Sequence, residues 1–185
     1  MSKKPDTLRR QMVASSRLFR VESLGLRFSN GVEVEYERLV SSGGGAVLVV
    51  PMLDDDTVLL IREYAAGTER YELGLPKGRV EPGEDPLVAA DRELQEEAGY
   101  GARRLSHVRH VSLAPAYMQH RTQIILAEDL YPQRQQGDEP EPIEVVPWRL
   151  SRLSELVIHE DFSEARSMAA LFLVRDILQQ RKDTR

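Results

Sequence analysis

The stretch from Gly78 to Tyr100, GRVEPGEDPLVAADRELQEEAGY, joins a glycine-containing loop to a helix with two different flanks. Asp85 can cap this helix, and Pro86 can occupy its first turn, where a missing N–H has no cost. Apolar residues then recur at helical spacing, namely Leu87, Ala90, Leu94 and Ala98. The stretch therefore predicts a helix over 86–98 that packs one flank on a core and presents polar groups on another.

The polar flank of this predicted helix carries carboxylates. At about 100° per residue, Glu93 and Glu97 project within about 40° of each other, and Glu96 lies on the adjoining side. Like charges four residues apart repel, and a hard divalent cation such as Mg²⁺ would relieve that repulsion. Arg92 can reach Glu96 and hold it in position. Taken alone, such a run is also typical of a solvated helix face, so its surroundings decide between the two interpretations.

The spacing within the stretch resembles the signature of one enzyme family. Its fixed positions, separated by five, seven, one and one residues, are Gly78, Glu84, Arg92-Glu93-Leu94, Glu96-Glu97 and Gly99. This pattern is similar to the Nudix box, and the apolar Tyr100 follows it where the family usually has an aliphatic residue. The resemblance implies the Nudix fold, an α/β (α+β) architecture with a mixed β-sheet sandwiched between helices and an N-terminal antiparallel β-hairpin extension.

The rest of the chain fits that architecture. Two alternating segments, 17–28 and 32–40, flank the turn signal Ser29-Asn30-Gly31 and predict the N-terminal hairpin. We expect residues 1–15 to lie outside regular structure, and we interpret Asp54–Asp56 as a solvated hairpin tip rather than a metal site. Further strands are predicted at 46–53, 57–64, 104–112, 121–128 and 143–148, and helices at 151–159 and 162–182. The hairpin extension is expected to occupy residues 1–42 and the Nudix domain residues 43–185.

Composition narrows the classes of function. The chain has no cysteine, which excludes disulfides, thiolate zinc sites and cysteine nucleophiles. Neither a His-Glu-x-x-His spacing nor a Gly-x-Ser-x-Gly elbow occurs, so zinc-protease and serine-hydrolase chemistry are unsupported. The net charge is −5 without a basic block, which argues against nucleic acid as a partner. No signal region follows the basic N-terminus and no run of about 18 apolar residues occurs, so we expect a cytoplasmic protein without a membrane partner.

Features outside the box resemble the ADP-ribose pyrophosphatase branch of the family. Pro115 lies sixteen residues after Gly99, where that branch carries a proline, and the runs REY and ELGLPKG are similar as well. The resemblance implies Mg²⁺ as the cofactor, with Mn²⁺ or Zn²⁺ as replacements. The implied ligands are Glu93, Glu96, Glu97 and the backbone carbonyl of Lys77, supported by Glu84 and Arg92. Gly78 and Gly99 would serve backbone geometry.

The branch also implies catalytic and substrate-binding residues. Its general base is a glutamate on the loop before the last strand, here GDEPEPIE, so Glu139 is the preferred base and Glu141 an additional metal contact. In this branch an aromatic ring and an arginine of the N-terminal hairpin bind adenine, roles that fall to Phe19 and Arg38. The remaining implied binding residues are Arg62 for a phosphate, and Pro115 and Tyr117 for the pocket wall.

The reaction implied by the resemblance is hydrolysis of the pyrophosphate bond of ADP-linked compounds. The candidate substrates are ADP-ribose and NADH, which would release AMP, and the diadenosine polyphosphate Ap3A, which would release AMP and ADP. A homodimer is expected, because the hairpin exchanges between subunits in this branch. Two alternatives stay open: a Nudix pyrophosphatase for another compound, such as GDP-mannose, a nucleoside triphosphate or a capped RNA end, and a sensor that binds ADP-ribose without cleaving it. The low basic content argues against RNA, and the intact set of box glutamates argues against a sensor.

Overall fold

The computed structural model describes residues 3–41 and 43–184, and the chain divides into two compact units. The first unit comprises Met1–Gly43 and Ser112–Arg121, and the second comprises Gly44–Val111 and Thr122–Arg185. The predicted boundary at residue 42 lies outside the described residues, as do residues 1, 2 and 185. The sequence did not predict that residues 112–121 group with the N-terminal segment, because the two are far apart along the chain.

The first unit contains a four-stranded sheet made, in order, of β1 (Asp6–Ser15), β2 (Arg20–Arg27), β3 (Glu33–Val40) and β9 (Met118–Gln119). β2 and β3 pair antiparallel, so the predicted hairpin is confirmed. Gly31 in the turn between them has a positive φ of 86°, which glycine adopts without strain. The short β9 pairs with β3 in parallel and brings residues 118–119 beside the hairpin.

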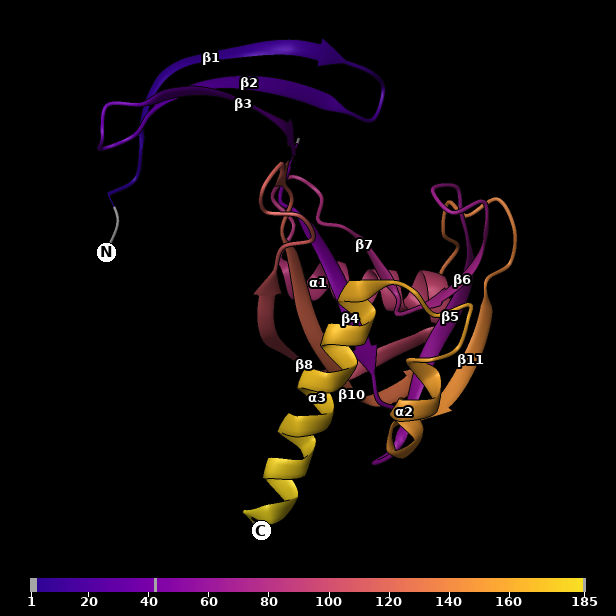
Figure 1. Ribbon diagram of the computed structural model, residues 1–185. Coiled ribbons are helices and arrows are strands. Elements are labelled where there is room, and N and C mark those ends of the chain that lie inside the picture. Colours follow the sequence, from indigo (N-terminus) through magenta and orange to yellow (C-terminus); the bar gives the residue numbers. More distant parts are fainter. Residues whose placement is uncertain (1–2, 42, 185) are drawn as a thin grey trace. The chain divides into compact units, whose positions relative to one another are not determined.

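The expectation that residues 1–15 lie outside regular structure is wrong for Asp6–Ser15. This segment forms β1, which pairs antiparallel with β2 from Asp6↔Arg27 to Ser15↔Arg20 (Figure 1). All ten residues of β1 are exposed. Backbone hydrogen bonds hold such an edge strand even where it has no buried face, so the side-chain pattern carried no signal for it.

The second unit is built from a mixed sheet and a smaller antiparallel sheet. The mixed sheet comprises, in order, β7 (Lys77–Arg79), β4 (Ala46–Pro51), β10 (Thr122–Pro132) and β8 (Tyr100–Val111). β4 and β10 run parallel, and the other two pairs are antiparallel. The antiparallel sheet comprises β11 (Glu144–Arg149), β5 (Thr57–Ala65) and β6 (Arg70–Gly74), in that order. The five strands predicted in this part of the chain all form, with β6 and β7 in addition.

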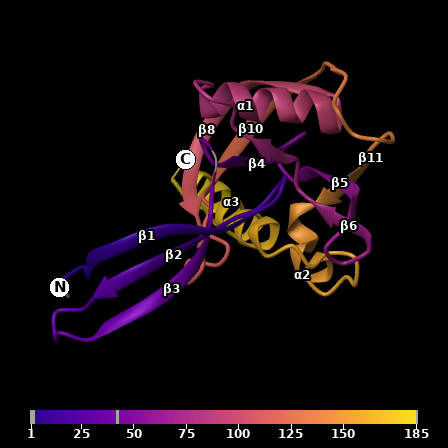
Figure 2. The same cartoon turned by 90° about the horizontal axis from the view of Figure 1, so that it is seen from above.

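Helices cover both faces of the mixed sheet. They are α1 (Pro86–Glu93), which continues as a π-helix (Leu94–Ala98), α2 (Leu153–Leu156) after a 3-10 turn (Leu150–Arg152), and α3 (Ala165–Asp183). On β4, Val47 and Val49 pack in one core cluster with Ala90 of α1. The alternate residues Leu48 and Val50 pack in a second cluster with α3. Figure 2 shows β4 and β10 between α1 and α3, so the predicted sandwich is confirmed and explains the unbroken apolar run AVLVV.

The helix expected over 86–98 is present, but its last turn is not α-helical. α1 ends at Glu93, and Leu94–Ala98 form a π-helix. Gly99 ends the π-helix with a left-handed φ of 76°. π turns are rare and are frequently found at functional sites, so this change of helix type draws attention to the region that carries the box glutamates.

Two acidic side chains bind backbone donors where the sequence predicted a cap and a turn. Asp85 accepts a hydrogen bond from the Leu87 N–H at 2.8 Å, at the start of α1. Asp54 accepts from the N–H groups of Asp56 at 2.8 Å and Thr57 at 2.7 Å. The acidic triplet therefore stabilises the tight turn before β5.

One carboxylate fixes the N-terminus of α3. Glu164 accepts hydrogen bonds from the N–H groups of Arg166 at 3.2 Å and Ser167 at 2.9 Å, and from the Ser167 hydroxyl at 2.8 Å. The same hydroxyl accepts from the Leu75 N–H at 3.1 Å. Burial by itself raises the pKa of Glu164, but the hydrogen bonds and the ion pair with Arg166 outweigh it and leave this pKa below its ordinary value.

None of the helices in the described ranges is long and apolar enough to cross a membrane.

Replacement of Glu164 by alanine is expected to lower the free energy of unfolding by about 2 kcal/mol, because buried donors of α3 lose their acceptor. Chemical denaturation at neutral pH measures the change, with the exposed Glu160→Ala as control. The folded-state pKa of Glu164 is depressed, so its stabilisation is present above the unfolded-state pKa and is lost as pH falls through the folded-state pKa. A difference from wild type that stays constant in acid would contradict this role.

Candidate functional site

The Glu93 carboxylate lies directly against the backbone of Gly78 on β7. A Cβ built on Gly78 would lie 2.0 Å from the Cδ atom of Glu93, far inside van der Waals contact. Glu93 is only 8% exposed, so its side chain has little room to move away. A glycine is therefore required here because a strand and a helix-borne carboxylate approach each other so closely.

Glu97, in the π-helix, borders the same strand. Its carboxylate accepts a hydrogen bond from the Lys77 N–H at 2.9 Å, and the residue is 4% exposed. Burial raises the pKa of Glu97 to about 8, with further repulsion from Glu63 and Glu93 and an opposing effect of Lys77. Lys77 in turn forms an ion pair with Glu63 at 2.7 Å. Two buried carboxylates thus converge on the Lys77–Gly78 segment.

Arg92 holds the other carboxylates of the box in place. Its Nε donates to Glu84 at 3.0 Å, and its Nη1 donates to Glu93 at 2.8 Å and to Glu96 at 3.2 Å. Its Nη2 donates to the Arg79 carbonyl at 3.0 Å, which ties α1 to β7. The hydrogen bond from Arg92 also lowers the pKa of Glu84, despite partial burial. The predicted contact between Arg92 and Glu96 is present, and the guanidinium orients three glutamates at once.

These groups have the chemistry that a hard divalent cation requires. Glu93, Glu96 and Glu97 offer carboxylate oxygens and Lys77 offers a backbone carbonyl, the donors that Mg²⁺ prefers. Burial raises the pKa of Glu93 as well as that of Glu97, because the protein interior disfavours their ionised forms, and a bound cation would favour those forms. Within residues 3–41 and 43–184, no three acidic or histidine side chains are already grouped as a ligand set. Glu93, Glu96, Glu97 and the Lys77 carbonyl are therefore the groups that would hold such a cation.

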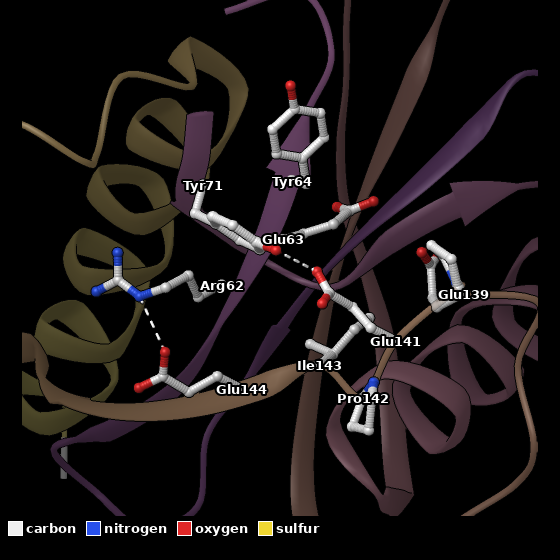
Figure 3. A pocket seen from close by; sticks show the side chains of 10 residues that line it. Arg62, Glu63, Tyr64, Tyr71, Glu139, Glu141, Pro142, Ile143 and Glu144 are labelled. Atoms are coloured by element: carbon white, nitrogen blue, oxygen red, sulfur yellow. Dashed lines mark hydrogen bonds and ion pairs between the residues drawn. The ribbon is translucent and has the colours of Figure 1, made fainter. Parts of the chain in front are cut away.

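The loop between β10 and β11 borders two cavities of the second unit. One, of about 360 Å³, lies between the loop and strands β5 and β6 (Figure 3). The other, of about 520 Å³, lies between the loop and Glu96. The residues that line both cavities are Glu139, Pro140, Glu141, Pro142 and Ile143. The acidic loop singled out from the sequence therefore does reach Glu96 of the box.

Contacts with the π-helix anchor this loop. The Gln135 N–H donates to the Gln95 carbonyl at 3.1 Å, and the two side-chain amides are hydrogen-bonded at 2.7 Å. Gly137 packs against Glu96, since a Cβ built on it would lie 3.3 Å from the Glu96 Cβ atom. The loop and the carboxylate-bearing helix thus form one connected structure.

Glu139 and Glu141 have different surroundings. Burial raises the pKa of Glu139, and repulsion from Glu63 and Asp138 adds to the effect. Glu141 extends toward β6, where it accepts a hydrogen bond from the Tyr71 hydroxyl (Figure 3). Glu139 therefore faces other carboxylates, whereas the Glu141 carboxylate is engaged by a phenol.

Glu63, Tyr64 and Tyr71 are among the residues of the first cavity that were given no role from the sequence. Glu63 pairs with Lys77, and Tyr64 and Tyr71 are cross-strand neighbours whose ring centroids lie 5.5 Å apart. The available signal was the change from the apolar run TVLLI to the charged and aromatic run REY within one strand. Such a change indicates a strand that leaves the core and reaches a surface or a cavity.

Arg62, predicted to hold a phosphate, is engaged by acidic partners. It donates to Glu144 at 3.0 Å and to Asp161 at 2.6 Å, and these contacts raise its pKa further. It also lines the smaller cavity. A phosphate would have to compete with two carboxylates for this guanidinium, and the predicted role stays a prediction.

Four predicted substrate-binding residues belong to the first unit, namely Phe19, Arg38, Pro115 and Tyr117. Arg38 forms an ion pair with Glu22 at 2.7 Å. Phe19 is 54% exposed and Tyr117 is 55% exposed. The Tyr117 carbonyl accepts a hydrogen bond from the Leu39 N–H at 2.8 Å, so the two predicted segments meet within this unit. Their contacts with a substrate stay predictions.

Comparison with known proteins agrees with this geometry. A family profile described as the NUDIX domain matches residues 44–172. The chain belongs to the Nudix family. A second profile, described as the NudE-type Nudix hydrolase N-terminal domain, matches residues 5–38. The family suggested by the box spacing is therefore confirmed, and the box lies within the matched Nudix domain.

Individual relatives resemble the chain over most of its length. It is 50% identical over 176 residues to the ADP compounds hydrolase NudE of Escherichia coli (strain K12), covering 95% of this chain and 94% of that protein. It is 29% identical over 142 residues to an ADP-ribose pyrophosphatase of Bacillus subtilis (strain 168), covering 75% and 77%. A crystal structure of an ADP compounds hydrolase has a TM-score of 0.91 and 49% identity over 98% of this chain and 97% of that chain.

Replacement of Gly78 by alanine in the Nudix box is expected to weaken binding of Mn²⁺ about 10- to 100-fold, because the added Cβ displaces the Glu93 carboxylate. Titration with Mn²⁺ followed by electron paramagnetic resonance measures the affinity. Gly67→Ala is the matched control, since a Cβ at that position meets no atom within 4 Å. An unchanged affinity in a folded Gly78→Ala protein would show that this close approach does not serve a cation.

Proposed function

We propose that this protein hydrolyses the pyrophosphate bond of ADP-linked compounds. ADP-ribose and NADH would yield AMP, and Ap3A would yield AMP and ADP. The observation that carries the proposal is the convergence of buried Glu93 and Glu97 on the Lys77–Gly78 segment, with the loop of Glu139 beside them. The ADP-linked substrate class is supported by 50% identity to a protein named an ADP compounds hydrolase.

Glu93, Glu96, Glu97 and the Lys77 carbonyl would hold Mg²⁺, with Mn²⁺ or Zn²⁺ as replacements. When bound, the cation neutralises charge on the pyrophosphate oxygens and lowers the pKa of water. Arg92 and Glu84 keep the glutamates oriented, and the Lys77 N–H fixes one oxygen of Glu97. These contacts thus hold the carboxylates in fixed orientations, whereas freely rotating side chains would not keep them there.

Glu139 is the proposed general base, which accepts a proton from the attacking water. It lines both cavities of the loop, and the wider one also contains Glu96. Glu141 is less suited to this role, because its carboxylate already accepts the Tyr71 hydroxyl. Glu141 stays a proposed additional metal contact, available once that hydrogen bond breaks.

The adenine would bind to Phe19 and Arg38, with Pro115 and Tyr117 in the pocket wall and Arg62 on a phosphate. These roles are supported by the match of residues 5–38 to a NudE-type N-terminal domain. A homodimer with exchanged hairpins and a cytoplasmic location complete the proposal. The dimer rests on the sequence resemblance, and the location rests on the expectation drawn from the sequence.

AMP release from ADP-ribose, NADH, Ap3A, GDP-mannose and dATP tests the reaction. Activity on the ADP-linked compounds is expected with Mg²⁺ and not with EDTA, and Glu97→Gln should lower it at least about 100-fold, because one buried ligand charge is lost. Glu81→Gln is the matched control, because Glu81 is an exposed glutamate at a position of the box that the family pattern does not fix. Tight binding of ADP-ribose without AMP would indicate a sensor, and cleavage confined to GDP-mannose or dATP would indicate another Nudix substrate.

Glu139→Gln and Glu141→Gln separate the two candidate bases. We expect Glu139→Gln to lower kcat about 100- to 10,000-fold with Mg²⁺ affinity retained, since general base catalysis contributes a factor of that size. Glu141→Gln should reduce kcat by less than about tenfold. Single-turnover AMP formation at saturating ADP-ribose is the measurement. The reverse order of effects would transfer the base role to Glu141.

A further inference from the structure

Two half-exposed tyrosines stand at the smaller cavity beside the catalytic loop. Tyr64 on β5 and Tyr71 on β6 are direct cross-strand partners, and their rings meet edge to face at 71°. Tyr64 is 51% exposed and Tyr71 is 46% exposed, although both line a cavity of about 360 Å³. Aromatic surface left open inside a cavity of this size is typical of a small-molecule site.

The Tyr64 and Tyr71 rings differ in how far contacts with the loop restrict them. The Tyr71 hydroxyl donates to Glu141, which fixes Tyr71 between β6 and the loop (Figure 3). Figure 3 shows the Tyr64 ring above Tyr71 and directed away from Glu141. Tyr71 therefore serves as a support held by the loop, and the face of Tyr64 is available for stacking.

The charge of the lining limits what this cavity can bind. Glu63, Glu139, Glu141 and Glu144 contribute carboxylates. Among the described residues, Arg62 is the one cation that lines the cavity, and it is already paired with Glu144 and Asp161. Further phosphate groups would be repelled by such a lining. A neutral or cationic ring would not be repelled, and sugar hydroxyls could donate to the free carboxylate oxygens.

Position links this cavity to the proposed reaction. Glu139 lines the cavity and also faces Glu63, whose partner Lys77 lies next to Gly78 in the box. A group attached to a pyrophosphate that is bound through a cation at the box glutamates would therefore extend along the loop toward Tyr64. Pro140 and Pro142 give this path rigid apolar walls.

We propose that Tyr64, supported by Tyr71, stacks on a planar uncharged or cationic ring carried by the half of the substrate that is not AMP. This subsite rests on the proposed function, in which the first unit binds the adenine of the AMP half. The tyrosines would then favour compounds with a ring at the far end of the pyrophosphate over compounds that end in a bare sugar.

NADH and ADP-ribose are a matched pair for the test, since NADH is ADP-ribose with a dihydronicotinamide ring on the far ribose. The measured quantity is the ratio of kcat/KM for NADH to kcat/KM for ADP-ribose. Tyr64→Leu is expected to lower this ratio about tenfold, because an aromatic stacking contact of about 1.4 kcal/mol is lost for NADH alone. Tyr64→Phe keeps the ring and should leave the ratio within about twofold of wild type.

The same experiment separates the subsite from a structural role. If the tyrosine pair only stabilises the β5–β6 hairpin, Tyr64→Leu would lower Tm and would lower kcat/KM equally for both substrates. The ratio would then be unchanged, and an unchanged ratio in Tyr64→Leu overturns the proposal. A wild-type protein that releases no AMP from either compound would instead refute the proposed function, and the subsite with it.

Discussion

The contact between the Glu93 carboxylate and the backbone of Gly78 sets the geometry of the whole site. β4 places β7 at the edge of the mixed sheet, and α1 packs across that sheet through its apolar flank. At the crossing, a glycine leaves just enough room for a carboxylate. Any side chain at this position would push α1 away from β7, and with it the π-helix that carries Glu97.

Arg92 offsets the electrostatic repulsion among these closely spaced carboxylates. Its three ion pairs, with Glu84, Glu93 and Glu96, keep partly buried negative charges solvated by protein groups. No guanidinium of residues 3–41 or 43–184 pairs with Glu97, which accepts a hydrogen bond from the Lys77 N–H instead, and burial is the largest influence on its pKa. A bound cation would redistribute these contacts rather than create the cluster.

The loop between β10 and β11 links the carboxylate cluster to the cavity that faces β5 and β6. Gln135 and Gly137 fix its first half on the π-helix, and the bond between Tyr71 and Glu141 fixes its second half on β6. Glu139 lies between these two attachments. A residue held in this way can keep one orientation toward both the box and the cavity, as a base that acts on an aligned water requires.

The sequence alone determined the family, the helix over 86–98, the hairpin and the sheet between helices. Each of these follows from local spacing: the intervals of the box, the turn at Gly31, and the unbroken apolar run of β4. The sequence also placed the acidic loop near the box, although from resemblance to relatives rather than from the residues themselves. Such features can be predicted from the sequence because they depend on residues that lie only a few positions apart.

Only the tertiary structure decided the features that depend on distant neighbours. β1 forms because β2 offers a hydrogen-bonding edge, not because its exposed side chains favour a strand. The pairing of Lys77 with Glu63 and the bond between Tyr71 and Glu141 join residues whose separation along the chain hides their contact. The π form of the last helical turn likewise left no mark in the spacing of the box. Hydrogen bonds and close packing between separate elements act through space, so no spacing within the sequence records them.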